Sequence, residues 1–168
     1  MLDRSGALNA YAKTELIDGG VYHMDAQHRP HARIKSRLYR LLADALDQQD
    51  GTLEAMVEAS VAMLPNNVPE PDLVVTDAAE GDGLVPLTSV KLIVEVSDTS
   101  LITAMGSKAS VYARHRVPEY WVVDLNGRVI HQMWAPEGEA YTEQRQLAFG
   151  ERIAAATVPG LRVETSGL

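Results

Sequence analysis

The sequence contains no cysteine in its 168 residues. This absence excludes a disulfide framework, a thiolate metal site and a cysteine nucleophile, and it fits a reducing compartment. No apolar run approaches the roughly 20 residues that a membrane-spanning helix needs. The segment MLDRSGALNAYAKTELIDGG also has no apolar core of signal-peptide length. We therefore expect a cytoplasmic protein without a membrane segment.

Several common catalytic and nucleotide-binding motifs are also missing. Neither G-x-G-x-x-G nor a GKS or GKT motif follows a predicted strand, which excludes a Rossmann or P-loop domain. No serine lies in a strained G-x-S-x-G turn, so Ser-His-Asp catalysis is not expected. No internal repeat divides the chain. The length suits one domain over residues 1–168, with a core at about 14–135 and C-terminal strands within 137–168.

Positive charge is scarce and unevenly placed. The net charge is −8, which argues against a protein that coats nucleic acid. Residues 43–82 contain ten acids and no lysine or arginine. Residues 28–40 show the reverse, with no acid and with Arg29, Arg33, Lys35, Arg37 and Arg40. This segregation fits neighbouring sites for an anion and a divalent cation, and it equally fits a solvated surface whose charges happen to separate.

Hydrophobic periodicity predicts the elements of the first half. Residues 14–24 read as two short strands about a turn with two glycines, which allow a positive φ. A helix is expected from Pro30 to a point within 47–51. Its apolar stripe consists of Ile34, Leu38, Leu41, Leu42 and Ala45. The period of residues 53–64 is ambiguous, and we favour a strand there.

The second half contains the strongest strand signal. A short buried strand is expected at 73–75, directly after three prolines. The segment VKLIVEVS at 90–97 is apolar at nearly every position, as in a central strand buried on both faces. A helix over 103–116 then precedes the strand EYWVVDL, an Asn-Gly turn and VIHQMW. Weaker strands are expected at 153–157 and 161–164. The order predicts an α/β fold, in which helices flank a mixed central sheet with added hairpins.

A charged residue interrupts this buried strand. Glu95 lies within VKLIVEVS, and an unpaired buried carboxylate costs several kcal/mol. Asp72 raises the same question at the start of the preceding short strand. Two carboxylates on adjacent strand ends would repel each other unless a hard cation such as Mg²⁺ or Mn²⁺ lay between them. Alternatively, Glu95 is exposed at the strand end or pairs with an arginine from a neighbouring helix.

The motif P-D-L-V-V, followed about twenty residues later by L-I-V-E-V-S, resembles the PD-(D/E)XK signature of restriction endonucleases and related nucleases. More specifically, an ordered set of motifs is similar to a large bacterial branch described as restriction endonucleases, much of it functionally unassigned. The set consists of ELIDGG, HARIKSRLYRLL, EPDLVV, LIVEVSDTSL, a K-x-x-x-Y-A motif and VPEYWVVDL. Each motif is weak alone, but the ordered set extends from about Glu15 to about Leu125. The resemblance implies a restriction-endonuclease-like fold.

The resemblance also implies roles for individual residues. Asp72 and Glu95 match the acidic metal ligands, and Lys108 matches a lysine that this branch carries on the following helix. Such a lysine could orient the attacking water or neutralise the phosphate. Glu15 matches a recurrent acid, as a further ligand or base or simply a hairpin residue. His31 matches a recurrent position at a helix start, where it could touch a phosphate or the carboxylates.

Two positions depart from the resemblance. The superfamily commonly has a lysine two residues after the second acid, where this chain has Ser97. Relatives often carry an aspartate four residues before the helix lysine, where this chain has Ala104. The acidic net charge and the Ala104 departure favour a nuclease fold that binds or assembles without cutting, whereas Asp72, Glu95 and Lys108 favour catalysis. A metal-dependent hydrolase of smaller substrates is a third hypothesis.

The activity implied is metal-dependent hydrolysis of phosphodiester bonds in DNA, with Mg²⁺ or Mn²⁺ as cofactor. Arg33, Arg37 and Arg40 could hold the nucleic-acid backbone, or they could form an ordinary solvated helix face. A domain with one site per chain needs two copies to cut both strands. We therefore expect a homodimer that acts on nucleic acid.

Overall fold

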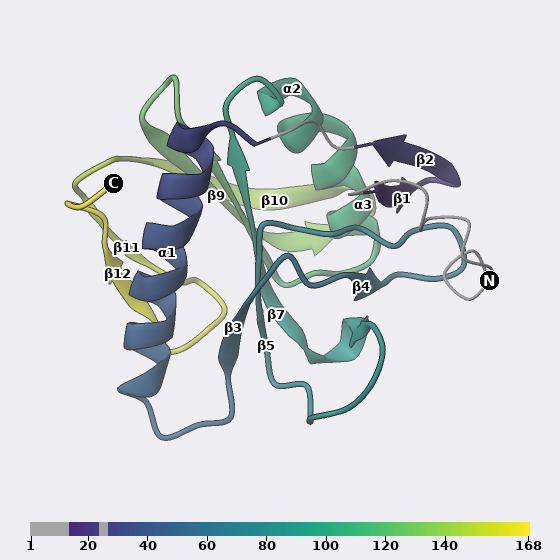
Figure 1. Ribbon diagram of the computed structural model, residues 1–168, viewed down its shortest axis with the longest axis horizontal. Helices are drawn as coiled ribbons and strands as arrows, with labels where there is room; N and C mark the ends of the chain where they lie inside the picture. The colour runs from purple at the N-terminus through teal and green to yellow at the C-terminus, as the bar shows by residue number, and fades with distance from the viewer. Residues whose placement is uncertain (1–13, 24–26) are drawn as a thin grey trace.

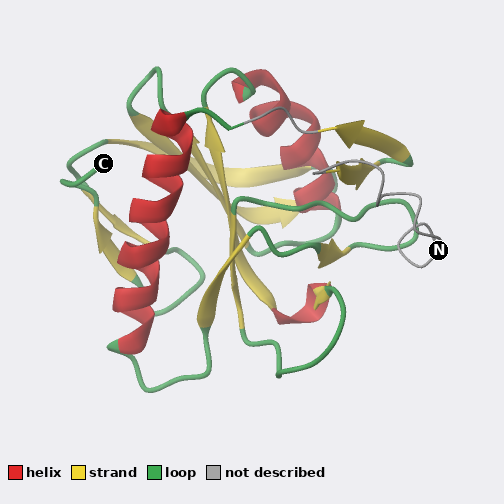
Figure 2. Ribbon diagram, viewed as in Figure 1, coloured by secondary structure: helices red, strands yellow, loops and turns green. Residues whose placement is uncertain are grey.

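The computed structural model describes residues 14–23 and 27–168. A six-stranded mixed sheet lies at its centre, with helices on both sides (Figure 1, Figure 2). The strand order is β10-β9-β8-β7-β5-β3. The bounds are Glu54–Val57 for β3, Leu73–Thr76 for β5, Val90–Ser97 for β7, Glu119–Asp124 for β8, Val129–Glu137 for β9 and Ala140–Ala148 for β10. β7 and β8 are parallel, and the other neighbouring strands are antiparallel.

Strand β7 is central and buried on both faces, as its sequence predicts. Ile93 belongs to one hydrophobic cluster, which also contains Tyr112. Val94 belongs to a second cluster on the other face, which also contains Trp121. Because successive side chains of a strand alternate between faces, Glu95 lies on the same face as Ile93.

Helix α1 (Arg29–Asp47) covers the face of the second cluster. Leu38, Leu42 and Leu46 are spaced at one helical turn and are buried there. The hairpin of β11 (Arg152–Ala154) and β12 (Arg162–Glu164) lies beside the helix (Figure 1). The predicted start near Pro30 and end near Asp47 are confirmed.

The opposite face carries a second helical segment, which is not a regular helix. It consists of α2 (Leu101–Thr103), a π-helical turn labelled η2 (Ala104–Lys108) and α3 (Ala109–Arg114). The sequence predicted one continuous helix over 103–116. Periodicity cannot reveal a π turn, because the turn inserts an additional residue while the chain stays helical.

Besides the β11–β12 hairpin, two further short strand pairs lie outside the central sheet. β1 (Thr14–Ile17) and β2 (Gly20–His23) form the predicted N-terminal hairpin. β4 (Val61–Ala62) pairs with β6 (Val85–Pro86), which leads into the 3₁₀ turn η1 (Leu87–Ser89). Among the described residues, no helix has the length and apolarity to cross a membrane.

The predicted α/β fold is confirmed, with one strand of the central sheet that the sequence did not indicate. β10 (Ala140–Ala148) spans nine residues and pairs with β9 almost along its whole length. Its sequence, AYTEQRQLA, is largely polar and exposed, so no apolar alternation marks it. Hairpin pairing with the adjacent strand β9, rather than burial of its own side chains, forms this strand.

Leu38 anchors α1 to the sheet, and its side chain is completely buried. We expect Leu38→Ala to lower the free energy of unfolding by about 2–5 kcal/mol, because it removes apolar contacts and leaves a cavity. Chemical denaturation measures this change. The control is Ser36→Ala on the exposed side of the same helix, which should shift stability by less than about 0.5 kcal/mol. Equal effects of the two variants would contradict this packing.

Candidate functional site

Asp72 and Glu95 lie opposite each other where β5 begins and β7 ends. In the antiparallel register Leu73 faces Val94, so the next pair outward is Asp72 and Glu95. Directly opposite residues on one face have Cβ atoms about 5 Å apart. Both side chains are buried, and both line a single pocket of about 330 Å³. The two carboxylates that the sequence suggested as a pair therefore converge.

Lys108 lies in the same pocket, at the end of the π-helical turn. Its ammonium is 2.9 Å from Oε1 of Glu15 and 3.0 Å from Oε1 of Glu95. The residue is only 8% exposed, so these ion pairs are largely shielded from water. Glu15 is held in turn by the backbone N–H of Glu70, which donates to its Oε2 at 3.3 Å. The structure thus brings together Glu15, Glu95 and Lys108 from three distant parts of the chain.

Tyr112 is a further member of the site. Its buried hydroxyl donates a hydrogen bond to Oε1 of Glu95 at 2.8 Å. The sequence placed Tyr112 toward the core without giving it a role. The available signal was its spacing of four residues from Lys108, which puts both side chains on one helix face.

Burial and charge set the protonation of this group. Burial raises the pKa of Glu95 to about 7, and Asp72 and Glu15 add to the rise while Lys108 opposes it. Burial lowers the pKa of Lys108, but the charges of Glu95 and Glu15 outweigh burial and leave the pKa above its ordinary value. Burial and the charge of Glu95 raise the pKa of Tyr112. Lys108 is therefore a cation and Tyr112 a neutral donor at neutral pH.

Asp72 has a different set of partners. Its Oδ2 accepts a hydrogen bond from the backbone N–H of Val96 at 2.8 Å and lies 3.3 Å from Nε2 of His31. Its Oδ1 lies 3.4 Å from Nζ of Lys35. Burial alone would raise the pKa of Asp72, but the hydrogen bond and charge of His31, the Val96 amide and Lys35 together lower it. Asp72 is therefore ionised at neutral pH.

His31 faces this carboxylate from the start of α1. Its Nε2 lies 2.9 Å from the carbonyl oxygen of Val96 as well as near Asp72. Both neighbours accept hydrogen bonds, so Nε2 carries the proton. Burial lowers the pKa of His31, but Asp72 and the Val96 carbonyl outweigh burial, so the net shift is upward. Nδ1 is buried and has no hydrogen-bond partner among the described residues.

Lys35 is a cation of the site that the sequence analysis did not single out. It is 6% exposed, and besides Asp72 its ammonium contacts Glu58 and the side-chain oxygen of Gln27 at 2.5 Å. Its position four residues after His31 was the available signal. Nothing in the local sequence connects Gln27 or Glu58 with this lysine, because the contacts span 8 and 23 residues.

The basic residues predicted on α1 are divided by the structure. His31 joins the carboxylates, whereas Arg33, Arg37 and Arg40 are exposed and do not line their pocket. Arg37 donates to the carbonyl oxygen of Gly167 at 2.8 Å, and Arg40 donates to that of Ser36 at 3.4 Å.

Residues 4–166 match the Uma2 family, described as "Putative restriction endonuclease". The chain belongs to the Uma2 family. A crystal structure of a "putative nuclease belonging to DUF820" from Anabaena variabilis has a TM-score of 0.67 at 15% identity, covering 92% of this chain and 84% of that chain. At this identity the likeness concerns the fold. No curated protein matches the chain.

These findings confirm the predicted resemblance, and the family supports a nuclease-like function. Within this Uma2 chain, the two departures have clear structural settings. The Ser97 hydroxyl is 3.1 Å from that of Ser100, so this position supplies a hydroxyl pair and no cation. Ala104 lines the carboxylate pocket with a methyl group, beside the ion pairs of Lys108. The positive charge therefore comes from Lys108, Lys35 and His31.

The chemistry of the donor set fits a hard divalent cation. Oε2 of Glu95 accepts no hydrogen bond within the described part of the chain, since its two donors share Oε1. Asp72 offers Oδ1, which has only the 3.4 Å contact with Lys35. No cluster of three or more His, Asp or Glu side chains suited to a metal is present in residues 14–23 and 27–168. Two carboxylates suit Mg²⁺, which commonly keeps several waters and also binds substrate phosphate.

The charge balance points the same way. Two ammonium groups contact four carboxylates here. Lys35 contacts Glu58 and Asp72, and Lys108 contacts Glu15 and Glu95. For these described residues alone, two negative charges remain when every acid is ionised and His31 is neutral, and one remains when His31 is protonated. A divalent cation would reduce this excess, and it would also favour the ionised form of Glu95.

The raised pKa of Glu95 makes stability depend on pH. Its pKa rises from about 4.5 to about 7 on folding, so its contribution to stability is complete below about pH 4.5 and is lost as pH rises through about 7. Glu95→Gln removes this titration. In EDTA, we expect the wild-type protein to lose up to ~3 kcal/mol of stability relative to Glu95→Gln between about pH 5 and pH 8.

Thermal unfolding at a series of pH values measures this difference. Glu54→Gln, which changes an exposed acid on β3, should follow the wild-type curve. If the melting temperatures of wild type and Glu95→Gln change in parallel with pH, Glu95 does not titrate in this range.

Proposed function

We propose that this Uma2 protein is a metal-dependent endonuclease that hydrolyses phosphodiester bonds of DNA. The observation that carries the proposal is the placement of Asp72 and Glu95 at opposite positions of an antiparallel strand pair, in one pocket with Lys108. The family description supports the same reaction class.

Asp72 and Glu95 would hold the cation, for which Mg²⁺ or Mn²⁺ is the chemical match. A bound divalent cation supplies positive charge to the scissile phosphate and lowers the pKa of water. The protein's part is to keep both carboxylates ionised and fixed. The Val96 amide and His31 do so for Asp72, and Lys108 opposes protonation of Glu95.

Lys108 would stabilise negative charge as it develops on the phosphate. Glu15 is a positioning residue in this proposal, because its contact with the ammonium fixes where Lys108 can reach. His31 would contribute a donor beside Asp72. Arg33, Arg37 and Arg40 would bind backbone phosphates with affinity that falls as salt increases. Cutting both strands of a duplex would require two copies, which favours a homodimer.

A non-cutting nuclease-fold module is the second candidate. The observation that favours it is that the described residues contain no group of three or more His, Asp or Glu side chains placed to hold a metal ion, combined with Ala104 at the pocket wall. In that case the carboxylates and Lys108 would act as a buried ion-pair network that holds the fold together.

Asp72 separates the two candidates. We expect Asp72→Asn to reduce Mg²⁺- or Mn²⁺-dependent DNA cleavage at least about 100-fold and to weaken Mn²⁺ binding, because a ligand charge is lost. Gel assays with single- and double-stranded DNA and RNA, together with Mn²⁺ titration by electron paramagnetic resonance, provide the measurements. Asp77→Asn, at the other end of β5, is the matched control and should cleave like wild type. Cleavage that persists unchanged in Asp72→Asn would reject this site, and its absence from the wild type would favour the non-cutting module.

Lys108 tests the role of the buried ammonium. We expect Lys108→Gln to lower the cleavage rate by roughly 100- to 1,000-fold, since a charge aimed at the transition state is lost. Mn²⁺ binding should persist, because Asp72 and Glu95 remain. Lys91→Gln is the control, as Lys91 pairs with Asp77 away from the pocket. Loss of Mn²⁺ binding together with cleavage would assign Lys108 to building the site rather than to the reaction.

A further inference from the structure

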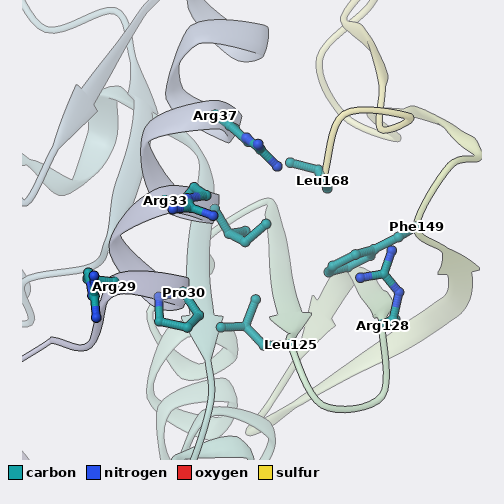
Figure 3. A pocket seen from close by; sticks show the side chains of 9 residues that line it. Arg29, Pro30, Arg33, Arg37, Leu125, Arg128, Phe149 and Leu168 are labelled. Atoms are coloured by element: carbon teal, nitrogen blue, oxygen red, sulfur yellow. The ribbon is translucent and has the colours of Figure 1, made fainter.

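A second pocket lies on another flank of α1 and is not part of the carboxylate site. It has a volume of about 540 Å³, and α1 forms one wall with Arg29, Arg33 and Arg37. Arg128, from the turn between β8 and β9, and Phe149, which follows β10, form the opposite wall (Figure 3). None of its lining residues is shared with the carboxylate pocket.

Four arginines gather here without acidic partners. Among the described residues, no Asp or Glu side chain lines the pocket, and none of the four forms an ion pair. In a chain with 23 acids and 15 lysines and arginines, four arginines without an acidic side chain among them form a local concentration of positive charge. Like charges held together are unfavourable on their own and favour a bound anion.

The arginines of α1 are arranged as a stripe. Arg29, Arg33 and Arg37 recur every four residues, so their side chains follow one face of the helix over about 12 Å. The first turn of α1 contains no acid, and its partial positive charge adds to that of Arg29. This length is comparable to that of a few consecutive phosphates on one strand.

The opposite wall holds Arg128 in an unusual conformation. Its φ is 51°, in the left-handed region that favours glycine. The carboxylate of Asp124 accepts hydrogen bonds from the backbone N–H groups of Asn126 and Gly127 at 3.0 Å each, which fixes the turn. The N–H of Phe149 donates to the carbonyl oxygen of Arg128 at 3.0 Å, and the Arg128 guanidinium lies 5.1 Å from the centre of the Phe149 ring. The arginine and the ring are therefore presented together.

Part of the pocket lining is apolar, which a site for phosphate alone would not require. Pro30, Ile34 and Leu125 line the pocket together with Phe149. Arginines combined with an aromatic ring and aliphatic side chains match the two parts of a nucleotide. Phosphates bind guanidinium groups, and bases stack on aromatic rings and on guanidinium planes.

We propose that this pocket binds an unpaired nucleotide of the nucleic-acid strand, with its phosphate at Arg29, Arg33, Arg37 and Arg128 and its base on the Phe149 side. The inference deepens the proposed nuclease function and rests on it for the identity of the strand. His31 and Lys35 point from the same turns of α1 to the carboxylates. In this proposal, one strand crossing the start of α1 would contact both pockets. Arg40 does not line the pocket, so its part in binding is secondary.

The test is binding to fluorescein-labelled DNA in EDTA, where cleavage cannot occur, followed by fluorescence anisotropy. Wild type should bind a single-stranded oligonucleotide more tightly than a blunt duplex of the same sequence. Phe149→Leu keeps apolar volume but removes the ring, and it should weaken single-strand binding roughly fivefold or more while leaving duplex binding within twofold. Arg33→Gln should weaken single-strand binding roughly tenfold and reduce the salt slope by about one.

Arg162→Gln is the matched control, because it removes an exposed arginine of β12 outside the pocket and should leave single-strand binding within about twofold. Arg33→Lys, which keeps the charge but not the two-pronged donor, should lie between wild type and Arg33→Gln. Competition by a mononucleotide and by inorganic phosphate distinguishes the ligand's parts, since the mononucleotide should compete better. Equal unfolding temperatures of all variants exclude loss of folding as the cause.

Several results would overturn the pocket assignment: undetectable binding of single-stranded DNA, equal affinity of wild type for duplex and single strand, or binding by Phe149→Leu and Arg33→Gln that matches Arg162→Gln. The cleavage assay is independent of this outcome. Pocket-dependent binding without Asp72-dependent cleavage would support the nucleotide pocket and reject the endonuclease. Asp72-dependent cleavage without pocket-dependent binding would support the endonuclease and reject the nucleotide pocket.

Discussion

Two buried carboxylates at opposite positions of an antiparallel strand pair repel each other, and this constraint shapes the surroundings of Asp72 and Glu95. Each carboxylate receives a cation from a different side of the sheet. Lys108 reaches Glu95 from the helical segment on one face, and Lys35 with His31 reaches Asp72 from α1 on the other. The helices on the two faces are thus tied electrostatically to the same strand end, in addition to their apolar packing.

The two carboxylates are unequal because their partners differ. Asp72 accepts a backbone hydrogen bond at the strand end and has a lowered pKa, whereas Glu95 is held by side chains and has a pKa of about 7. Chemically similar residues on adjacent strands therefore hold their protons very differently. Such separation of paired acids is common where a protein handles protons or metal ions.

The sequence predicted the parts of this structure that depend on local patterns. The apolar run around Glu95 identified the central strand, and the charge within it pointed to the site. The stripe of Leu38 and Leu42 identified α1. Motif order added Lys108 and Glu15, which no periodicity could have connected.

The remaining features depend on contacts that no local pattern marks. β10 exists because it forms a hairpin with β9, and its polar sequence alone gives no strand signal. Lys35 has the same local character as the neighbouring arginines, yet it is buried while they are exposed. Arg128 and Phe149 share a pocket with α1 residues that lie about 90 or more positions away in the sequence.

The wide spacing of Glu15, Asp72, Glu95 and Lys108 has a consequence during translation. These residues lie between the first tenth of the chain and nearly two-thirds of its length. During synthesis, the basic segment of α1 therefore emerges from the ribosome well before the π-helical turn has been synthesised. Because the pocket depends on pairing between β5 and β7 and on docking of Lys108, the nascent chain carries its positive helix before it carries an organised carboxylate site.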